Sequence, residues 1–224
     1  MLKAALAIAR KDLTLLVGRG TGLVQSFLLG LLLIFIFRLS KGIGEVVSAQ
    51  AAAAIFWVAT LFCQVLVFTS LYALEESNGQ RQALLLAPAP VQSVWLGKGL
   101  AGLFLLLFSQ LIFLPAVIVF LDQSLEGGIA AGIAAIILTD LGLAALGSLL
   151  GLLAQGQAAR ASLLSIIVFP LLLPLLFAAI RPVAAFFDAP LSADAADWLK
   201  IILAFDPLFL AAGLLLFRLV YNSQ

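Results

Sequence analysis

The chain has 224 residues, of which 64% are hydrophobic and 10% charged, and its mean hydropathy is +1.23. Soluble domains contain about 45–50% apolar residues, so this composition excludes a soluble domain and indicates an all-α integral membrane protein. The net charge of +1 excludes the basic surface of a nucleic-acid-binding protein. Because there is no histidine and Cys63 is the only cysteine, we expect neither an intrachain disulfide nor a metal site.

Residues 1–20 precede the first long apolar run and are predicted to form an amphipathic helix. Apolar side chains recur there at helical spacing, at Leu2, Leu6, Leu13, Leu16 and Val17. Lys3 and Arg10 share another face of the same helix. This pattern favours a helix that lies in the cytoplasmic membrane interface, and the alternative is a plain basic anchor that sets orientation.

Six apolar runs follow, each close to the roughly 20 residues that a membrane-spanning helix needs. We predict crossings at about 22–37, within 46–74, and at about 99–121, 129–153, 161–180 and 200–217. The whole chain, 1–224, then forms a single transmembrane domain. No second domain is predicted.

The basic residues predict the orientation of these crossings. With both termini in the cytoplasm, eight basic residues fall on the cytoplasmic side: Lys3, Arg10, Lys11, Arg19, Arg81, Lys98, Arg160 and Arg218. Four fall outside: Arg38, Lys41, Arg181 and Lys200. This bias favours cytoplasmic termini, a cytoplasmic loop at 75–98 and an external loop at 181–199.

Asp140 interrupts the fourth predicted crossing near its middle, in "AAIILTDLGLAALGSLLG". A charge at that depth costs at least about 2.5–3.5 kcal/mol, so we expect this carboxyl to face the bundle, be paired or carry a proton. A substrate or proton contact is one interpretation. A structural hydrogen bond to a neighbouring helix is the other.

Small residues and prolines mark two of the predicted crossings. Gly147 and Gly151 form a GxxxG pattern, which predicts close packing against another helix. Pro170 and Pro174 lie four residues apart in "LLSIIVFPLLLPLLFAAIRP", which predicts a bend or break in the fifth crossing. Such a bend fits a helix beside a transport pathway, although proline is also frequent in ordinary membrane helices.

The sequence carries no catalytic set, and we expect the chain not to be an enzyme. Ser162 and Ser165 have no histidine to activate them, and no carboxylates have metal-binding spacing. No glycine-rich phosphate loop follows a strand pattern.

The longest polar interruption in the first half is "LYALEESNGQRQALLLAPAPVQSVWLGK", residues 71–98. It combines Glu75 and Glu76, then Gly79 and Arg81, an apolar cluster that includes Leu84, then Pro88, and finally Gly97-Lys98 at the next crossing. This spacing resembles the permeases of ABC-2-type exporters, in which the loop docks on a nucleotide-binding subunit. The chain departs from the usual loop at Gln80 and Gln82.

Within that superfamily the chain resembles the CcmB family, the haem-exporter permeases of cytochrome c maturation. The similarity lies in "AIFWVATLF" and "LLSIIVFPLLLPLLF", together with a short six-span layout. It implies a multi-pass subunit of the bacterial inner membrane, present in two copies beside two copies of a separate ABC ATPase. Haem-handling membrane subunits would be further partners, ATP would bind the ATPase, and this chain would hold no cofactor.

The same resemblance implies that Glu75, Glu76, Gly79, Arg81, Leu84 and Pro88 carry the coupling to the ATPase. An ordinary solvated loop is the alternative for this segment. For the chain as a whole, the alternatives are an ABC-2 permease for a lipid, drug or polysaccharide, a proton-driven secondary transporter that uses Asp140, and a membrane scaffold.

Overall fold

The computed structural model describes the chain except for residues 43, 77–89, 155–157, 189–194 and 223–224. The described part is helical and contains no strand. Its helices are α1 (Leu2–Arg19), α2 (Thr21–Leu39), α3 (Ala49–Glu76), α5 (Val91–Phe120), α6 (Ile129–Ala154), α7 (Ala158–Ala184) and α8 (Ala195–Asn222). The predicted all-α class is therefore confirmed.

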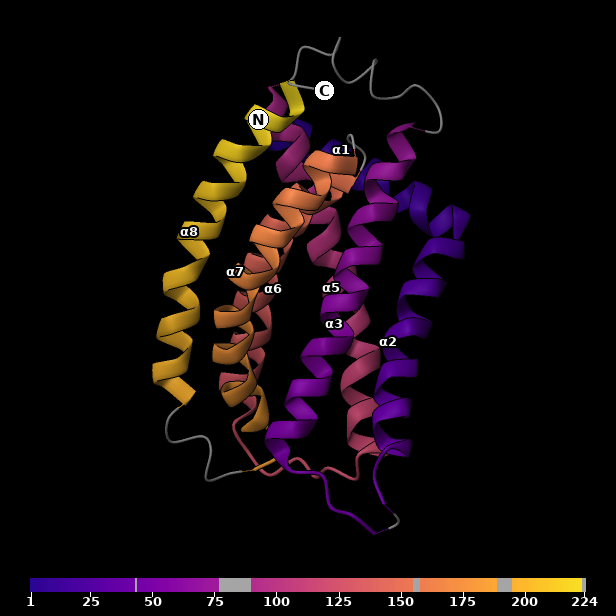
Figure 1. Ribbon diagram of the computed structural model, residues 1–224, viewed down its shortest axis with the longest axis vertical. Helices are drawn as coiled ribbons and strands as arrows, with labels where there is room; N and C mark the ends of the chain where they lie inside the picture. Colours follow the sequence, from indigo (N-terminus) through magenta and orange to yellow (C-terminus); the bar gives the residue numbers. More distant parts are fainter. Residues whose placement is uncertain (43, 77–89, 155–157, 189–194, 223–224) are drawn as a thin grey trace.

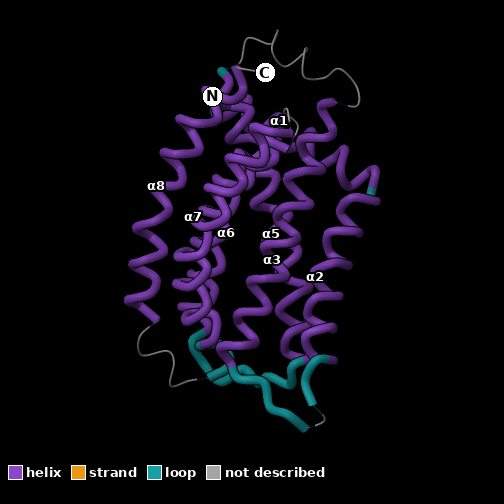
Figure 2. The backbone as a smooth tube through the Cα atoms, in the orientation of Figure 1, coloured by secondary structure: helices purple, strands orange, loops and turns teal. Residues whose placement is uncertain are grey.

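The helices form one elongated bundle (Figure 1). Helices α2 to α8 run along its long axis, whereas α1 crosses its upper end before the chain turns down into α2. Both termini lie at this upper end, where α3 also finishes and α5 starts. Figure 2 shows most of the described loop residues gathered at the opposite end.

Five of these helices are long and apolar enough to cross a bilayer. The qualifying stretches are Gly22–Leu39, Ala49–Leu74, Val91–Phe120, Ile129–Ala154 and Ala195–Phe217. Helix α7 has 27 residues. Among those of its residues whose side chains are described, the apolar stretch is Leu172–Ala184, which is shorter than the five others. The chain is a multi-pass membrane protein, and the sixth crossing stays a prediction.

Two predicted boundaries need correction. The helix that contains the third predicted crossing begins at Val91 rather than about Gly99, since it extends through Trp95 and Lys98, which are buried in the bundle. The sixth begins at Ala195 rather than Lys200. The connections between α3 and α5 and between α7 and α8 are therefore shorter than the predicted loops 75–98 and 181–199.

The outer surface of the bundle is apolar, as expected where lipid replaces water. Large side chains are exposed on the outward faces of several long helices, including Leu111 and Val119 on α5 and Leu215 on α8. Helices that are apolar on all sides are typical of membrane spans. The buried polar side chains therefore need partners inside the bundle.

Helix α1 packs chiefly against α5, and its buried face differs from the apolar face predicted from spacing. Ala5, Ile8, Ala9 and Leu16 are buried, together with the charged Asp12, whereas Leu2, Leu6 and Val17 are exposed. The small buried residues let α1 approach the bundle closely. A location of the exposed apolar face in the membrane interface stays a prediction.

The turn from α2 to α3, at the lower end of the bundle, is held by local charges. Glu45 accepts hydrogen bonds from Lys41 Nζ at 2.8 Å and from the Gly42 backbone N–H at 3.1 Å. The hydrogen bond from Lys41 is the main reason that the pKa of Glu45 lies below its ordinary value. This turn is exposed, so its ion pair contributes little to stability.

Candidate functional site

The predicted coupling residues fall on both sides of the boundary of the described structure. Glu75 and Glu76 are the last two residues of α3. Gly79, Arg81, Leu84 and Pro88 lie within 77–89, outside the described residues. What the structure describes are the two helical stems of this segment, the end of α3 and the start of α5.

A buried ammonium group joins the two stems. Lys98 lies about two turns into α5, and its side chain is fully buried. Its Nζ donates to the Leu71 carbonyl oxygen of α3 at 2.8 Å and lies 4.6 Å from the centroid of the Tyr72 ring. A cation over an aromatic face at this distance is attracted by the ring.

The same ammonium group binds α1. Lys98 Nζ donates to Asp12 Oδ2 at 3.1 Å, and both side chains are 0% exposed. The second oxygen, Asp12 Oδ1, lies 3.0 Å from Lys11 Nζ, although the pair lacks hydrogen-bond geometry. The ion pair between Asp12 and Lys98 therefore joins α1 to α5, and its two residues are 86 positions apart in the sequence.

A hydroxyl chain attaches α6 to the same region. Tyr72 Oη lies 2.7 Å from Ser148 Oγ, and Ser148 Oγ donates to the Trp95 carbonyl oxygen at 3.2 Å. Since that bond uses the serine proton, the tyrosine hydroxyl is the donor in the first bond. Trp95 Nε1 in turn donates to the Ala145 carbonyl oxygen at 3.3 Å. We call the four residues Asp12, Lys98, Tyr72 and Ser148 the stem junction.

A second polar contact lies deeper in the bundle. Gln110 Nε2 on α5 donates to Asp140 Oδ1 on α6 at 2.9 Å, and both side chains are buried. Asp140 Oδ2 has no hydrogen-bond partner among the described residues. The hydrogen bond to a neighbouring helix is the geometry that the structural interpretation of Asp140 requires.

Comparison with known protein families agrees with this architecture. Residues 3–217 match the family described as CcmB protein. The chain belongs to the CcmB family. This match covers nearly the whole chain and confirms the resemblance inferred from its apolar stretches and loop spacing. None of the curated proteins compared with the chain matches it.

In this CcmB-family chain, the two glycines of the GxxxG pattern lie against α3. A Cβ at Gly147 would lie 2.5 Å from the Phe68 ring, and a Cβ at Gly151 would lie 2.5 Å from the Tyr72 ring and 2.8 Å from the Phe68 carbonyl oxygen. Such distances are shorter than any carbon contact tolerates. Glycine is therefore required at both positions for α6 to approach α3 this closely.

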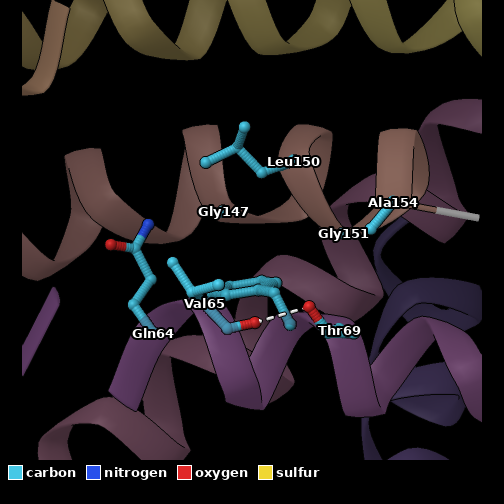
Figure 3. Close-up of a pocket in the computed structure, with 8 residues that line it drawn as sticks. Gln64, Val65, Thr69, Gly147, Leu150, Gly151 and Ala154 are labelled. Atoms are coloured by element: carbon cyan, nitrogen blue, oxygen red, sulfur yellow. Dashed lines mark hydrogen bonds between the residues drawn. The ribbon is translucent and has the colours of Figure 1, made fainter. Parts of the chain in front are cut away.

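A narrow groove of about 90 Å³ runs between α3 and α6 (Figure 3). Its lining residues are Gln64, Val65, Phe68, Thr69, Gly147, Leu150, Gly151 and Ala154. Two polar groups are engaged within the protein: Gln64 Nε2 donates to the Leu143 carbonyl oxygen at 2.7 Å, and Thr69 Oγ1 donates to the Val65 carbonyl oxygen at 2.7 Å. Gln64 Oε1 is buried and has no hydrogen-bond partner among the described residues. The groove is too small for a haem-sized cargo.

Helix α7 is continuous through Pro170, Pro174 and Pro182. The backbone helix is not interrupted at the first two prolines, so of the predicted bend or break only the bend stays a prediction. Both Pro170 and Pro174 are exposed on the surface of the chain. A proline in a membrane helix is tolerated where neighbouring groups satisfy the freed carbonyl.

Three buried charged residues were not recognised as site residues from the sequence. Asp12 and Lys98 each look like ordinary charges beside an apolar run, and only their packing makes them partners. Asp206 on α8 lies inside an apolar run as Asp140 does, so the same rule could have found it. It is 2% exposed and lies against Gly142 of α6, and neither carboxyl oxygen has a hydrogen-bond partner among the described residues.

The described residues contain no group of three or more histidine, cysteine, aspartate or glutamate side chains that could hold a metal ion. Cys63 is buried in α3. The described part contributes helix packing and buried charge pairing, and the family match makes the chain a membrane permease subunit.

Proposed function

We propose that this CcmB-family chain is the permease subunit of an ATP-driven exporter complex that serves cytochrome c maturation. The observation that carries this proposal is the family match over residues 3–217 of a multi-pass helical chain. In this proposal ATP binds and is hydrolysed on a separate ABC ATPase, and this chain holds no cofactor. Two copies of each subunit assemble with haem-handling membrane subunits.

The proposed orientation places both termini in the cytoplasm of a bacterium, with α7 as the sixth crossing of the inner membrane. The position of both termini beside the end of α3 and the start of α5 supports this arrangement. Residues 77–89 then face the cytoplasm, where an ATPase is accessible. The basic bias of the same end has the sign that cytoplasmic loops require.

Coupling in this proposal passes through Glu75, Glu76, Gly79, Arg81, Leu84 and Pro88. Movement of the ATPase displaces this segment, and the attached helices α3 and α5 rock with it as rigid bodies. The buried contacts between the stems support the idea that these two helices move together. A purely flexible connection would transmit no such displacement.

The test of this function begins with copurification of the chain with a separate ATPase. We expect the charge reversal Glu75→Lys/Glu76→Lys to weaken that association or to uncouple ATP hydrolysis. Glu126→Lys is the matched control, because Glu126 is exposed in the loop between α5 and α6. That loop lies at the opposite end of the bundle (Figure 1). Unchanged association and unchanged coupled turnover in the double reversal would remove the coupling role.

Cargo is tested separately. Deletion of the gene is expected to abolish holo-cytochrome c, whereas normal cytochrome maturation would favour an ABC-2 permease for a lipid, drug or polysaccharide. Reconstitution of the complex then distinguishes movement of haem from release of a protein partner.

Asp140 motivates a second candidate, a proton-driven transporter. Its carboxyl is buried near the middle of α6, and one oxygen has no hydrogen-bond partner among the described residues. Transport in vesicles that depends on a proton gradient, needs no ATPase and is lost in Asp140→Asn would favour this candidate. Transport that requires ATP and survives Asp140→Asn would exclude it.

A further inference from the structure

Lys98 joins its own helix, α5, to two others through one atom. Its Nζ is on α5, lies 3.1 Å from Asp12 Oδ2 of α1, and donates to the Leu71 carbonyl oxygen of α3 at 2.8 Å. The Tyr72 ring, also on α3, covers the ammonium group at 4.6 Å. The charge is therefore enclosed by groups from α1 and α3. A movement of any one of the three helices would change its contacts with the other two.

The backbone around the ion pair is packed as closely as its side chains. A Cβ at Gly97 would lie 2.8 Å from the Ala5 carbonyl oxygen and 2.9 Å from Ile8 Cβ, both on α1. Glycine at this position lets α1 rest directly on α5. Asp12 and Lys98 thus meet only when α1 has one particular register against α5.

The ion pair lies between the two stems of residues 77–89. Leu71 and Tyr72 lie within the last two turns of α3, and Lys98 lies about two turns after the start of α5. The other end of the pair, Asp12, belongs to α1, whose opposite face exposes Leu2, Leu6 and Val17. A displacement of the stems therefore reaches a helix that presents apolar side chains outward.

Stability alone does not explain a buried ion pair at this place. Removing two charges from water offsets much of their mutual attraction, and apolar residues of similar volume often stabilise a fold equally well or better. The best-attested use of such a pair is to fix a register or a switch. The contacts above locate that register between α1 and the two stems.

We call residues 75–88, which contain the predicted coupling residues, the coupling segment. We propose that the Asp12–Lys98 ion pair is the contact that makes α1 move with α3 and α5 when the coupling segment is displaced. This inference rests on the proposed function, because it needs an ATPase that displaces the segment. Asp12 and Lys98 act as positioning residues: they touch neither cargo nor ATP, and they convert movement of the stems into movement of α1. Without the pair, the stems move and α1 does not follow.

The test uses the whole complex with its copurifying ATPase and compares Asp12→Leu, Lys98→Met and the double variant. Each single variant removes the Asp12–Lys98 contact and leaves the other charge buried, so we expect a lower Tm in both. The double variant removes both charges, and we expect its Tm to return to that of the wild type. We expect its transport-coupled ATP hydrolysis and its holo-cytochrome c yield to stay reduced by about five-fold or more.

A double variant that regains both Tm and coupling overturns the proposal and leaves the pair a structural contact. A second measurement keeps the two charges in place. An environment-sensitive label on Leu6→Cys, on the exposed face of α1, is expected to change emission when ATP is added to the wild-type background. An unchanged signal in a complex that hydrolyses ATP overturns the proposal even if the double variant fails to fold.

These outcomes are distinguishable from failure of the proposed function. If Glu75→Lys/Glu76→Lys leaves ATPase association and coupling intact, the coupling segment has no such role and the inference about α1 falls with it. If that reversal uncouples the complex while the Asp12→Leu/Lys98→Met double variant behaves as wild type, only the inference about α1 is wrong.

Discussion

The contact between α3 and α6 leads to a quantitative prediction for Gly147→Ala. The added Cβ would lie 2.5 Å from two atoms of the Phe68 ring and 2.9 Å from Gln64 Nε2. Carbon atoms pack best at about 3.5–4.0 Å, so the ring must move by about 1 Å. Its movement is restricted at the tip of the ring, which packs on Gly102 of α5: a Cβ there would lie 2.1 Å from Phe68 Cζ.

The expected magnitude combines three effects. Overpacking costs about 1–3 kcal/mol, and disturbing the hydrogen bond from Gln64 to the Leu143 carbonyl oxygen costs about 1 kcal/mol. Alanine is better than glycine in a helix by about 1 kcal/mol, which offsets part of this. We therefore expect Gly147→Ala to lower the free energy of unfolding by about 1–3 kcal/mol.

The assay is SDS-titrated unfolding in mixed micelles, followed by circular dichroism. Gly18→Ala is the matched control: a Cβ at Gly18 meets nothing within 4 Å, so this change is expected to be neutral or slightly stabilising. Phe68→Leu placed in the Gly147→Ala background is expected to recover part of the loss by making space. Equal stability of Gly147→Ala and the wild type, or no recovery with Phe68→Leu, would refute the reasoning.

Two further predictions concern hydrogen bonds between helices. In a double-mutant cycle, Asp140→Leu and Gln110→Leu are expected to couple by about 0.6 kcal/mol, and by no more than about 1.7 kcal/mol, measured in the same unfolding assay; additive effects would mean that the two side chains do not interact. Tyr72→Phe removes the hydroxyl that donates to Ser148 and is expected to destabilise the chain by about 0.5–1.5 kcal/mol while leaving the ring over Lys98 in place. Ser148→Ala also removes the bond to the Trp95 carbonyl oxygen, so the double variant decides: a loss no larger than that of Ser148→Ala alone would identify the Tyr72–Ser148 bond as the cause, whereas additive losses would contradict it.

Much of the fold follows from local patterns. Five long apolar helices lie where the runs predicted them, because each spanning segment must satisfy its own backbone in lipid. The ends of the helices were harder to predict. Helix α5 begins at Val91 because Trp95 and Lys98 have partners in the bundle, and these partners cannot be recognised from the local sequence. Helix α7 runs through its prolines without interruption, and the bend predicted at Pro170 and Pro174 stays a prediction.

The candidate site was predictable in part. The spacing around Glu75 and Pro88 predicted an ABC-2-type permease, and two apolar stretches indicated the CcmB family, which the family match then established. The residues of the coupling segment that lie in 77–89 are outside the described structure, so their role stays a prediction. Asp140 was expected to find a partner in the bundle, and the amide of Gln110 fills that place.

The sequence by itself determined that this protein is a helical membrane protein of the CcmB family, because hydropathy, helix length and motif spacing are properties of contiguous residues. Only the tertiary structure decided which charges meet. Asp12 and Lys98 stand 86 positions apart, and their pairing depends on the register of α1 against α5 at Gly97. That register is set by packing between distant segments, which no local pattern encodes.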